Sequence, residues 1–116
     1  MERDTQALLD MFQSAELVLV YLKDVTESDF YRNVQVQDAV IRRLLVVGEA
    51  ASRVSISTQN NLPDVAWPQM RGMRNRLVHE YDGIDLVIVW QTTQTVLPTL
   101  IVRLERYLQA NGCLDR

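Results

Sequence analysis

The segment from Arg71 to Tyr81 combines residue types that can cleave RNA without a metal ion. It contains His79, the only histidine of the chain, together with Arg71, Arg74 and Arg76. A histidine transfers protons near neutral pH, and an arginine holds a phosphate group through its planar, permanently charged guanidinium. We therefore expect His79 to act as a general acid or base, and Arg74 to stabilise negative charge on a phosphate.

RNA carries its own nucleophile, because its 2′-OH can attack the adjacent phosphorus. A protein then has to supply only proton transfer and charge stabilisation, so we predict no metal site and no cofactor. On an ideal helix Arg74 and His79 are offset by roughly 140°, so Arg74 must reach around the helix axis. A second subunit related by a two-fold axis could bring another such pair to the same cleft, which favours a homodimer.

The other polar residues of the segment are candidates for supporting roles. Asn75 lies four positions before His79 and shares its helix face, so it could hydrogen-bond the imidazole or a phosphate oxygen. Arg71 and Arg76 could help to bind the substrate. Tyr81 could contact a phosphate, stack on a base or accept a covalent modification.

The same residues also allow interpretations without catalysis. A single histidine near a helix end is usually structural or solvent-exposed, and three arginines on a helix usually form a solvated face. The main alternative function is a non-catalytic module that binds a nucleotide or a partner enzyme. A purely structural helical dimer is a further alternative. Glu49 interrupts an apolar run and needs a partner if it is buried, for which an arginine from the helix containing Arg74 is a candidate.

The composition indicates one domain, residues 1–116, with 47% hydrophobic residues to build its core. A net charge of −3 argues against proteins that coat nucleic acid indiscriminately. Positive charge is local, because no acidic residue lies between Val65 and His79. Eleven of the twelve basic residues are arginine, which suits phosphate recognition but is equally typical of a genome rich in G and C.

Three features predict a cytoplasmic protein that does not enter membranes. Cys113 is the only cysteine, so no internal disulfide can form. The first residues lack the basic start and apolar run of a signal peptide. The apolar stretch 86–104 is interrupted by glutamines, threonines, Pro98 and Arg103, so a bilayer span is not expected.

Hydrophobic periodicity predicts an all-α protein, an antiparallel four-helix bundle. The expected helices cover residues 2–23, 28–54 with a break near Asn33, 68–82 and 85–110, with a loop over 57–63. Pro68 should begin the third helix, Asp85 should cap the fourth, and Pro98 should kink it. The stretch 86–104 is apolar around much of its circumference, which a homodimer interface would use.

Landmarks along nearly the whole chain resemble the HepT family of HEPN-domain toxins. The landmarks are Gln37-Asp38-Ala39-Val40, Val47-Gly48-Glu49-Ala50, Pro63 to Trp67, Arg74-Asn75 with His79 and Tyr81, Ile84-Asp85, and Trp90. Their order in a chain of this size makes the Arg-x-x-x-x-His-x-Tyr signature specific.

The resemblance implies a HEPN-like, homodimeric ribonuclease toxin with the active-site cleft at the dimer interface. Arg74 and His79 would be its catalytic residues, and Asn75 would occupy the polar position after the arginine. The substrate would be cellular RNA, tRNA or mRNA. The resemblance further implies a toxin–antitoxin system in which a minimal nucleotidyltransferase antitoxin transfers AMP to Tyr81 and so blocks the nuclease.

Overall fold

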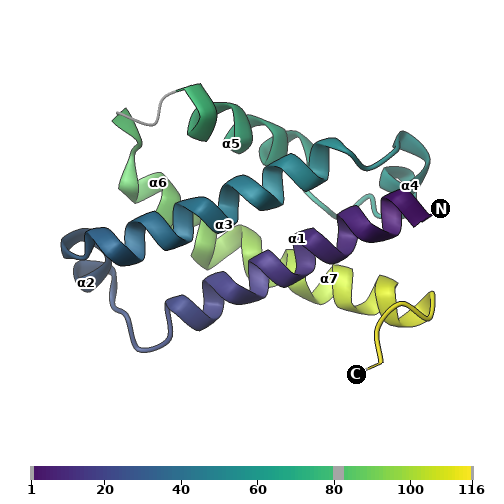
Figure 1. The fold of residues 1–116 in the computed structure, drawn as a ribbon, viewed down its shortest axis with the longest axis horizontal. Coiled ribbons are helices and arrows are strands. Elements are labelled where there is room, and N and C mark those ends of the chain that lie inside the picture. Colours follow the sequence, from purple (N-terminus) through teal and green to yellow (C-terminus); the bar gives the residue numbers. More distant parts are fainter. Residues whose placement is uncertain (1, 80–82, 116) are drawn as a thin grey trace.

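The computed structural model of the chain describes residues 2–79 and 83–115, and all regular structure within these ranges is helical (Figure 1). The elements follow in the order α1 (Glu2–Tyr21), α2 (Glu27–Arg32), α3 (Val34–Ser52), α4 (Ile56–Asn61), α5 (Trp67–His79), α6 (Leu86–Gln91), the π-helical turn η2 (Thr92–Val96) and α7 (Leu97–Ala110). The predicted all-α class is therefore confirmed.

The longer helices alternate in direction along the chain. α1 packs along α3, α3 along α5, and α7 along α1, while α6 contacts α2. Figure 1 shows α1 and α3 side by side with opposite directions, and α5 returning along α3. α3 is therefore the central element, which carries α1 on one side and α5 on the other.

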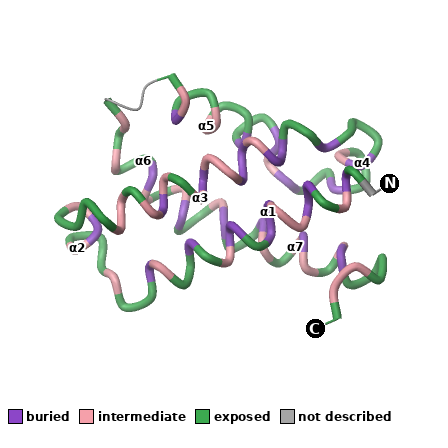
Figure 2. Tube along the Cα trace, viewed as in Figure 1, coloured by how far each residue is buried: buried purple, intermediate pink, exposed green. Residues whose placement is uncertain are grey.

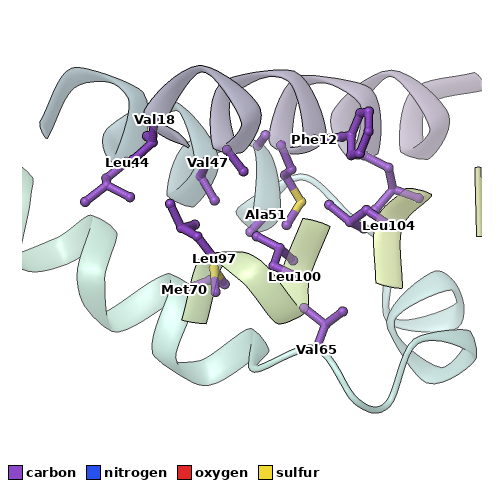
Figure 3. Close-up of a cluster of buried hydrophobic side chains, with 14 of the residues drawn as sticks. Phe12, Val18, Leu44, Val47, Ala51, Val65, Met70, Leu97, Leu100 and Leu104 are labelled. Carbon is purple, nitrogen blue, oxygen red and sulfur yellow. The ribbon is translucent and has the colours of Figure 1, made fainter. Parts of the chain in front are cut away.

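The core lies between α1, α3, α5 and α7. α1 turns one apolar face to the core, where it buries Leu8, Met11, Phe12, Ala15 and Val18, whereas Leu19 is exposed. Figure 2 shows the buried positions on the inward faces of the helices, and Figure 3 shows Leu44 and Val47 of α3 near Met70 of α5 and Leu97 of α7. The periodic burial of one face per helix is what hydrophobic packing of amphipathic helices requires.

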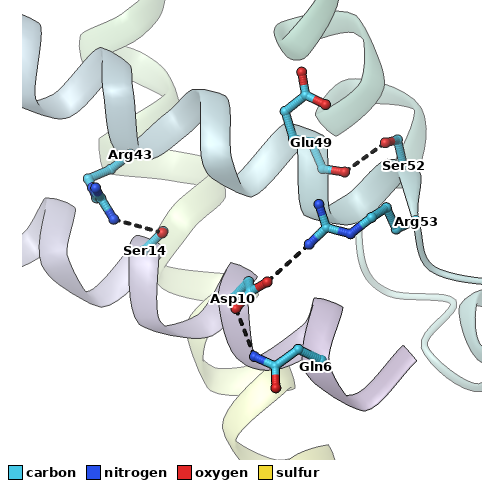
Figure 4. Close-up of polar contacts among 7 residues, drawn as sticks. All are labelled: Gln6, Asp10, Ser14, Arg43, Glu49, Ser52 and Arg53. Carbon is cyan, nitrogen blue, oxygen red and sulfur yellow. Dashed lines mark hydrogen bonds and ion pairs between the residues drawn. The ribbon is translucent and has the colours of Figure 1, made fainter. Parts of the chain in front are cut away.

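Polar contacts join α1 to α3 at the edge of this core. Arg53 pairs with Asp10 at 3.0 Å, and Arg43 donates a hydrogen bond to Ser14 at 3.4 Å (Figure 4). These contacts lie at the interface between α1 and α3, on the side of α3 opposite α5.

Helix caps explain most of the element boundaries. Asn33 ends α2 and caps α3, as the predicted break requires, and Asp85 caps α6 by accepting hydrogen bonds from the backbone N–H groups of Val87 and Ile88. α2 begins at Glu27 with Thr26 as its cap, one residue earlier than the expected start at Ser28. Asp29, the third residue of the helix, completes a capping box with Thr26.

The prediction of a loop over residues 57–63 is wrong, because residues 56–61 form the short helix α4. Ser55 caps this helix through the backbone N–H of Thr58. The buried carboxylate of Asp4, from α1, accepts hydrogen bonds from Ser55 and from the Thr58 hydroxyl. A contact between residues so distant in sequence has no local signal, which is why the polar composition of this segment is misleading.

The sequence predicts a kink at Pro98, and the structure has the π-helical turn η2 over the residues that precede it. The backbone N–H of Leu97 bonds to the carbonyl of Thr92, five residues earlier, and Pro98 then lies in the first turn of α7. A proline ring would clash with the carbonyl four residues before it in a regular α-helix. The wider π turn separates these groups. At its other end, α7 stops at Asn111 and Gly112, as predicted, with Gly112 at φ 72°.

None of the described helices is both long enough and apolar enough to cross a membrane.

Candidate active site

Arg74 lies on the side of α5 that packs against α3. Its Nε donates a hydrogen bond to the Oε1 of Glu49 at 3.0 Å, and the two side chains are about one third exposed, at 34% and 40%. Glu49 is therefore not buried, but it does have a partner, and this partner comes from the helix that was predicted to supply it.

Gly48 allows α3 and α5 to approach each other closely at Arg74. A Cβ atom added to Gly48 would lie 2.5 Å from the Cβ of Arg74 and 3.2 Å from its Cα. No side chain larger than hydrogen can occupy this position without moving one of the helices. Because Gly48 has no side chain, α3 can lie directly against the Cα and Cβ atoms of Arg74.

Asn75 contacts Arg74 within the described structure. The Nη1 of Arg74 donates a hydrogen bond to the Oδ1 of Asn75 at 3.1 Å, and Asn75 itself is exposed. Among the described residues, Asn75 does not form the expected hydrogen bond to the His79 imidazole. Asn75 instead holds the guanidinium from a second direction.

His79 is the last residue of α5 and is exposed to solvent. Arg71 and Arg76 are also exposed on this helix. Within residues 2–79 and 83–115, the side chains of His79 and of these two arginines form no hydrogen bond or ion pair, whereas the Arg74 side chain forms both. The side chains of His79, Arg71 and Arg76 on α5 thus face solvent. The guanidinium of Arg74 on the same helix is instead held by Glu49 and Asn75.

Tyr81 lies outside the described residues. The structure therefore does not test the prediction that Tyr81 contacts a phosphate or accepts a modification.

A groove of about 540 Å³ lies between α5 and the α6–η2 segment. Its lining is mainly apolar, with Leu44 of α3 at its base and Arg76 and Gln69 among its polar groups. Neither Arg74 nor His79 lines it. The groove is of a size that can hold a small organic group, but it is separate from the Arg74–Glu49 contact.

The site can perform two tasks. An exposed imidazole can exchange protons with a bound molecule and with water, and a guanidinium held through its Nε can present its remaining N–H groups to an anion. Among the described residues, no group of three or more histidine, cysteine or acidic side chains is arranged to hold a metal ion.

The sequence identified Arg74, Asn75 and His79 as site residues and Glu49 as a residue in need of a partner, but it assigned no role to Gly48. The signal for Gly48 was its place beside Glu49 inside an apolar helix, where glycine is unfavourable for helix formation. A glycine at such a position indicates close approach of another backbone, although it does not reveal which helix approaches.

Comparisons with known proteins agree on one family. A family model described as "Ribonuclease HepT-like" matches residues 11–107. The chain is 35% identical to "Putative RNase MJ1380" of Methanocaldococcus jannaschii over 100 residues, which cover 85% of this chain and 92% of that protein. It is 30% identical to "Probable ribonuclease HepT" of Thermococcus cleftensis over 99 residues, 85% of this chain and 90% of that protein. No solved structure is found to match the chain.

Proposed function

Because the chain belongs to the ribonuclease HepT-like family, we propose that it is a metal-independent ribonuclease that cleaves cellular RNA, either tRNA or mRNA. The observation that carries this proposal is the arginine held by Glu49 on the same helix as an exposed histidine. A phosphate-binding cation of fixed direction and a proton donor or acceptor are the two groups that cleavage by the RNA 2′-OH requires.

In the proposed mechanism His79 removes the proton of the 2′-OH or protonates the leaving 5′ oxygen. The 2′ oxygen then bonds to phosphorus and the bond from phosphorus to the 5′ oxygen breaks, which leaves a 2′,3′-cyclic phosphate. Arg74 stabilises the extra negative charge of the pentacoordinate phosphate. Asn75, Arg71 and Arg76 support the site by contacting Arg74 or neighbouring phosphates.

We propose that the active unit is a homodimer of antiparallel four-helix bundles whose cleft carries two copies of the motif. The alternating directions of α1, α3, α5 and α6–α7 support the bundle. The offset between Arg74 and His79 on α5 supports a second subunit, because a two-fold axis can bring the histidine of one copy near the arginine of the other. Val87, Ile88 and Val102 are exposed on α6 and α7, and they suit an interface between copies.

The family resemblance also supports a role as the toxin of a toxin–antitoxin system in the cytoplasm. In this proposal a minimal nucleotidyltransferase antitoxin transfers AMP from ATP to Tyr81. The added phosphate would place negative charge near the arginines of α5, and the nucleotide would occupy space needed by RNA. Both effects oppose substrate binding.

The ribonuclease proposal is tested by incubating unmodified protein with total tRNA and with mRNA in EDTA, beside His79→Ala and Arg74→Ala. Cleavage by the parent protein alone, seen as fragments on a denaturing gel, is the expected result. If the parent protein cleaves neither RNA at any concentration, the ribonuclease proposal fails. The non-catalytic module that binds a nucleotide or partner would then be favoured.

The modification is tested separately by mass spectrometry. The cognate nucleotidyltransferase with ATP should add AMP to the parent protein, and Tyr81→Phe should remain unmodified. Tyr31→Phe is the matched control, because Tyr31 lies on α2 and hydrogen-bonds Glu27 at 2.6 Å. An unchanged mass of the parent protein would reject the antitoxin proposal while leaving the nuclease proposal intact.

A further inference from the structure

The contact between Arg74 and Glu49 is too exposed to be mainly a source of stability. Both side chains retain a third or more of their exposure, and ion pairs of this kind contribute from nothing to about 1 kcal/mol. A carboxylate beside a guanidinium also weakens the attraction of that guanidinium for phosphate. The pair therefore needs an explanation other than stability or phosphate affinity.

The geometry of the pair restricts the direction of the guanidinium. Of its five N–H groups, the one on Nε bonds to Glu49 and one on Nη1 bonds to Asn75. Within the described part of the chain, the other three have no acceptor, and they lie at the far end of the group. An arginine held in this way presents Nη atoms to an incoming anion in one orientation.

A further contact, between Gly48 and Arg74, helps to hold the pair in register. Gly48 brings α3 against the Cα and Cβ of Arg74, so the base of the side chain cannot shift toward α3. Figure 4 shows the Glu49 carboxylate on the side of α3 away from Asp10 and α1. The neighbouring residues of α3 thus hold both ends of the arginine side chain: Gly48 meets its start and Glu49 its Nε.

We propose that Glu49 is a positioning residue that orients Arg74 for the transition-state phosphate and acts only through Arg74. This inference rests on the proposed ribonuclease function. An arginine with all its rotamers available would lose side-chain entropy each time it bound a phosphate, whereas a fixed one has already lost it. Glu49 thus assists the chemical step rather than RNA binding.

The test is a double-mutant cycle on a short RNA substrate, with kcat and KM measured for the parent, Glu49→Ala, Arg74→Ala and the double variant. We expect Glu49→Ala to lower kcat by about 10-fold or more with KM changed by less than about 3-fold. The double variant should be no slower than Arg74→Ala, because Glu49 has nothing to orient once the arginine is gone. Glu49→Gln should recover most of the lost rate, since its amide oxygen can still accept from Nε.

Three controls make the result specific. Asp38→Ala removes one negative charge from an exposed position of the same helix and should leave kcat unchanged. Glu49→Met keeps the length and apolar stem of the side chain, so it replaces Glu49→Ala if that variant unfolds. Thermal melting followed by circular dichroism confirms that each variant is folded.

The positioning role is overturned if Glu49→Ala cleaves RNA as fast as the parent, or if the effects of the two single variants multiply in the double variant. Failure of the proposed function looks different, because the parent protein itself would then cleave no RNA, and the positioning role would be rejected with it.

Discussion

Arg74 and Arg76 are only two positions apart, yet their surroundings differ. Arg74 meets Gly48 and Glu49 of α3, whereas Arg76 lines the groove beside α6. Two residues separated by roughly 200° on a helix face nearly opposite sides, so their roles differ although their chemistry is the same. At this scale the environment of a side chain, rather than its type, selects the arginine that can be catalytic.

The charge of Asp4 contributes to the fold rather than to the candidate site. Hydrogen bonds from the side chains of Ser55 and Thr58 hold the pKa of its carboxyl below the ordinary value of 3.8. A depressed pKa means that the stabilisation is fully present above about pH 4 and is lost as the pH falls through the lower, folded-state pKa. Asp4 should therefore contribute to acid unfolding.

Asp4→Asn is expected to lower the free energy of unfolding at pH 7 by about 1–3 kcal/mol, because one amide replaces a buried charged acceptor of several hydrogen bonds. The stability of the variant should also fall less than that of the parent between pH 5 and pH 2. Urea unfolding at several pH values measures both effects. Asp38→Asn is the matched control, since the same change at an exposed position should leave the stability within about 0.5 kcal/mol of the parent.

At the scale of elements, the contact between α3 and α5 decides the geometry of the site. The two helices approach closely enough that Gly48 leaves no room for a Cβ, and this approach lets Glu49 reach the Nε of Arg74. The buried side chains of Met70 and Leu77 lie on the same side of α5, one turn on each side of the arginine. Hydrophobic packing thus fixes the distance at which the polar pair forms.

Gly48→Ala is expected to destabilise the protein by about 1–3 kcal/mol, because its Cβ would overlap Arg74, even though alanine favours a helix by about 1 kcal/mol over glycine. RNA cleavage should fall as well, since Arg74 must move. Gly72→Ala is the control, because a Cβ at Gly72 meets no atom within 4 Å and should stabilise α5. Equal unfolding midpoints for the two variants in urea would contradict the close approach.

At the scale of the whole molecule, the outer surface of the α6–α7 segment exposes several apolar side chains. Val87 and Ile88 are 47% and 42% exposed, and Val102 is 46% exposed. Single exposed apolar residues are common on monomers, but several along one helical segment indicate a surface that a partner can cover. The proposed homodimer gives this surface a use and supplies the second copy of the motif.

Mixed dimers distinguish a site shared between subunits from one contained in each subunit. One chain carries Arg74→Ala and the other carries His79→Ala, and each variant is expected to be inactive alone. When the two are co-expressed with different tags and purified as mixed dimers, one shared site regains both residues. We expect RNA cleavage at about half the parent rate if each site takes its residues from two chains.

Association itself is measured by light scattering during size-exclusion chromatography. Ile88→Lys should lower the apparent mass of the parent dimer to that of a monomer, and Val34→Lys, an equally apolar exposed position on α3, is the control. Light scattering also shows whether the mixed chains of Arg74→Ala and His79→Ala are dimers. If they are dimers and still do not cleave RNA, the proposal of a site shared between subunits is wrong.

The sequence was enough to predict the all-α class, the break near Asn33 and the cap at Asp85, because local propensity and hydrophobic periodicity govern these features. It also identified the Arg74-to-Tyr81 motif and hence the family. These are properties of neighbouring residues or of their order along the chain, so no knowledge of the fold is needed to recognise them.

The partner that each side chain contacts, in contrast, depends on how the helices pack in three dimensions. Asp4 organises the start of α4 across more than fifty positions of sequence, and Glu49 meets Arg74 rather than another arginine of α5. Both contacts depend on how helices that are distant in sequence pack together, and packing distance is set by side chains from several elements at once. For this reason the composition of residues 57–63 indicated a loop, whereas the anchored segment forms a helix.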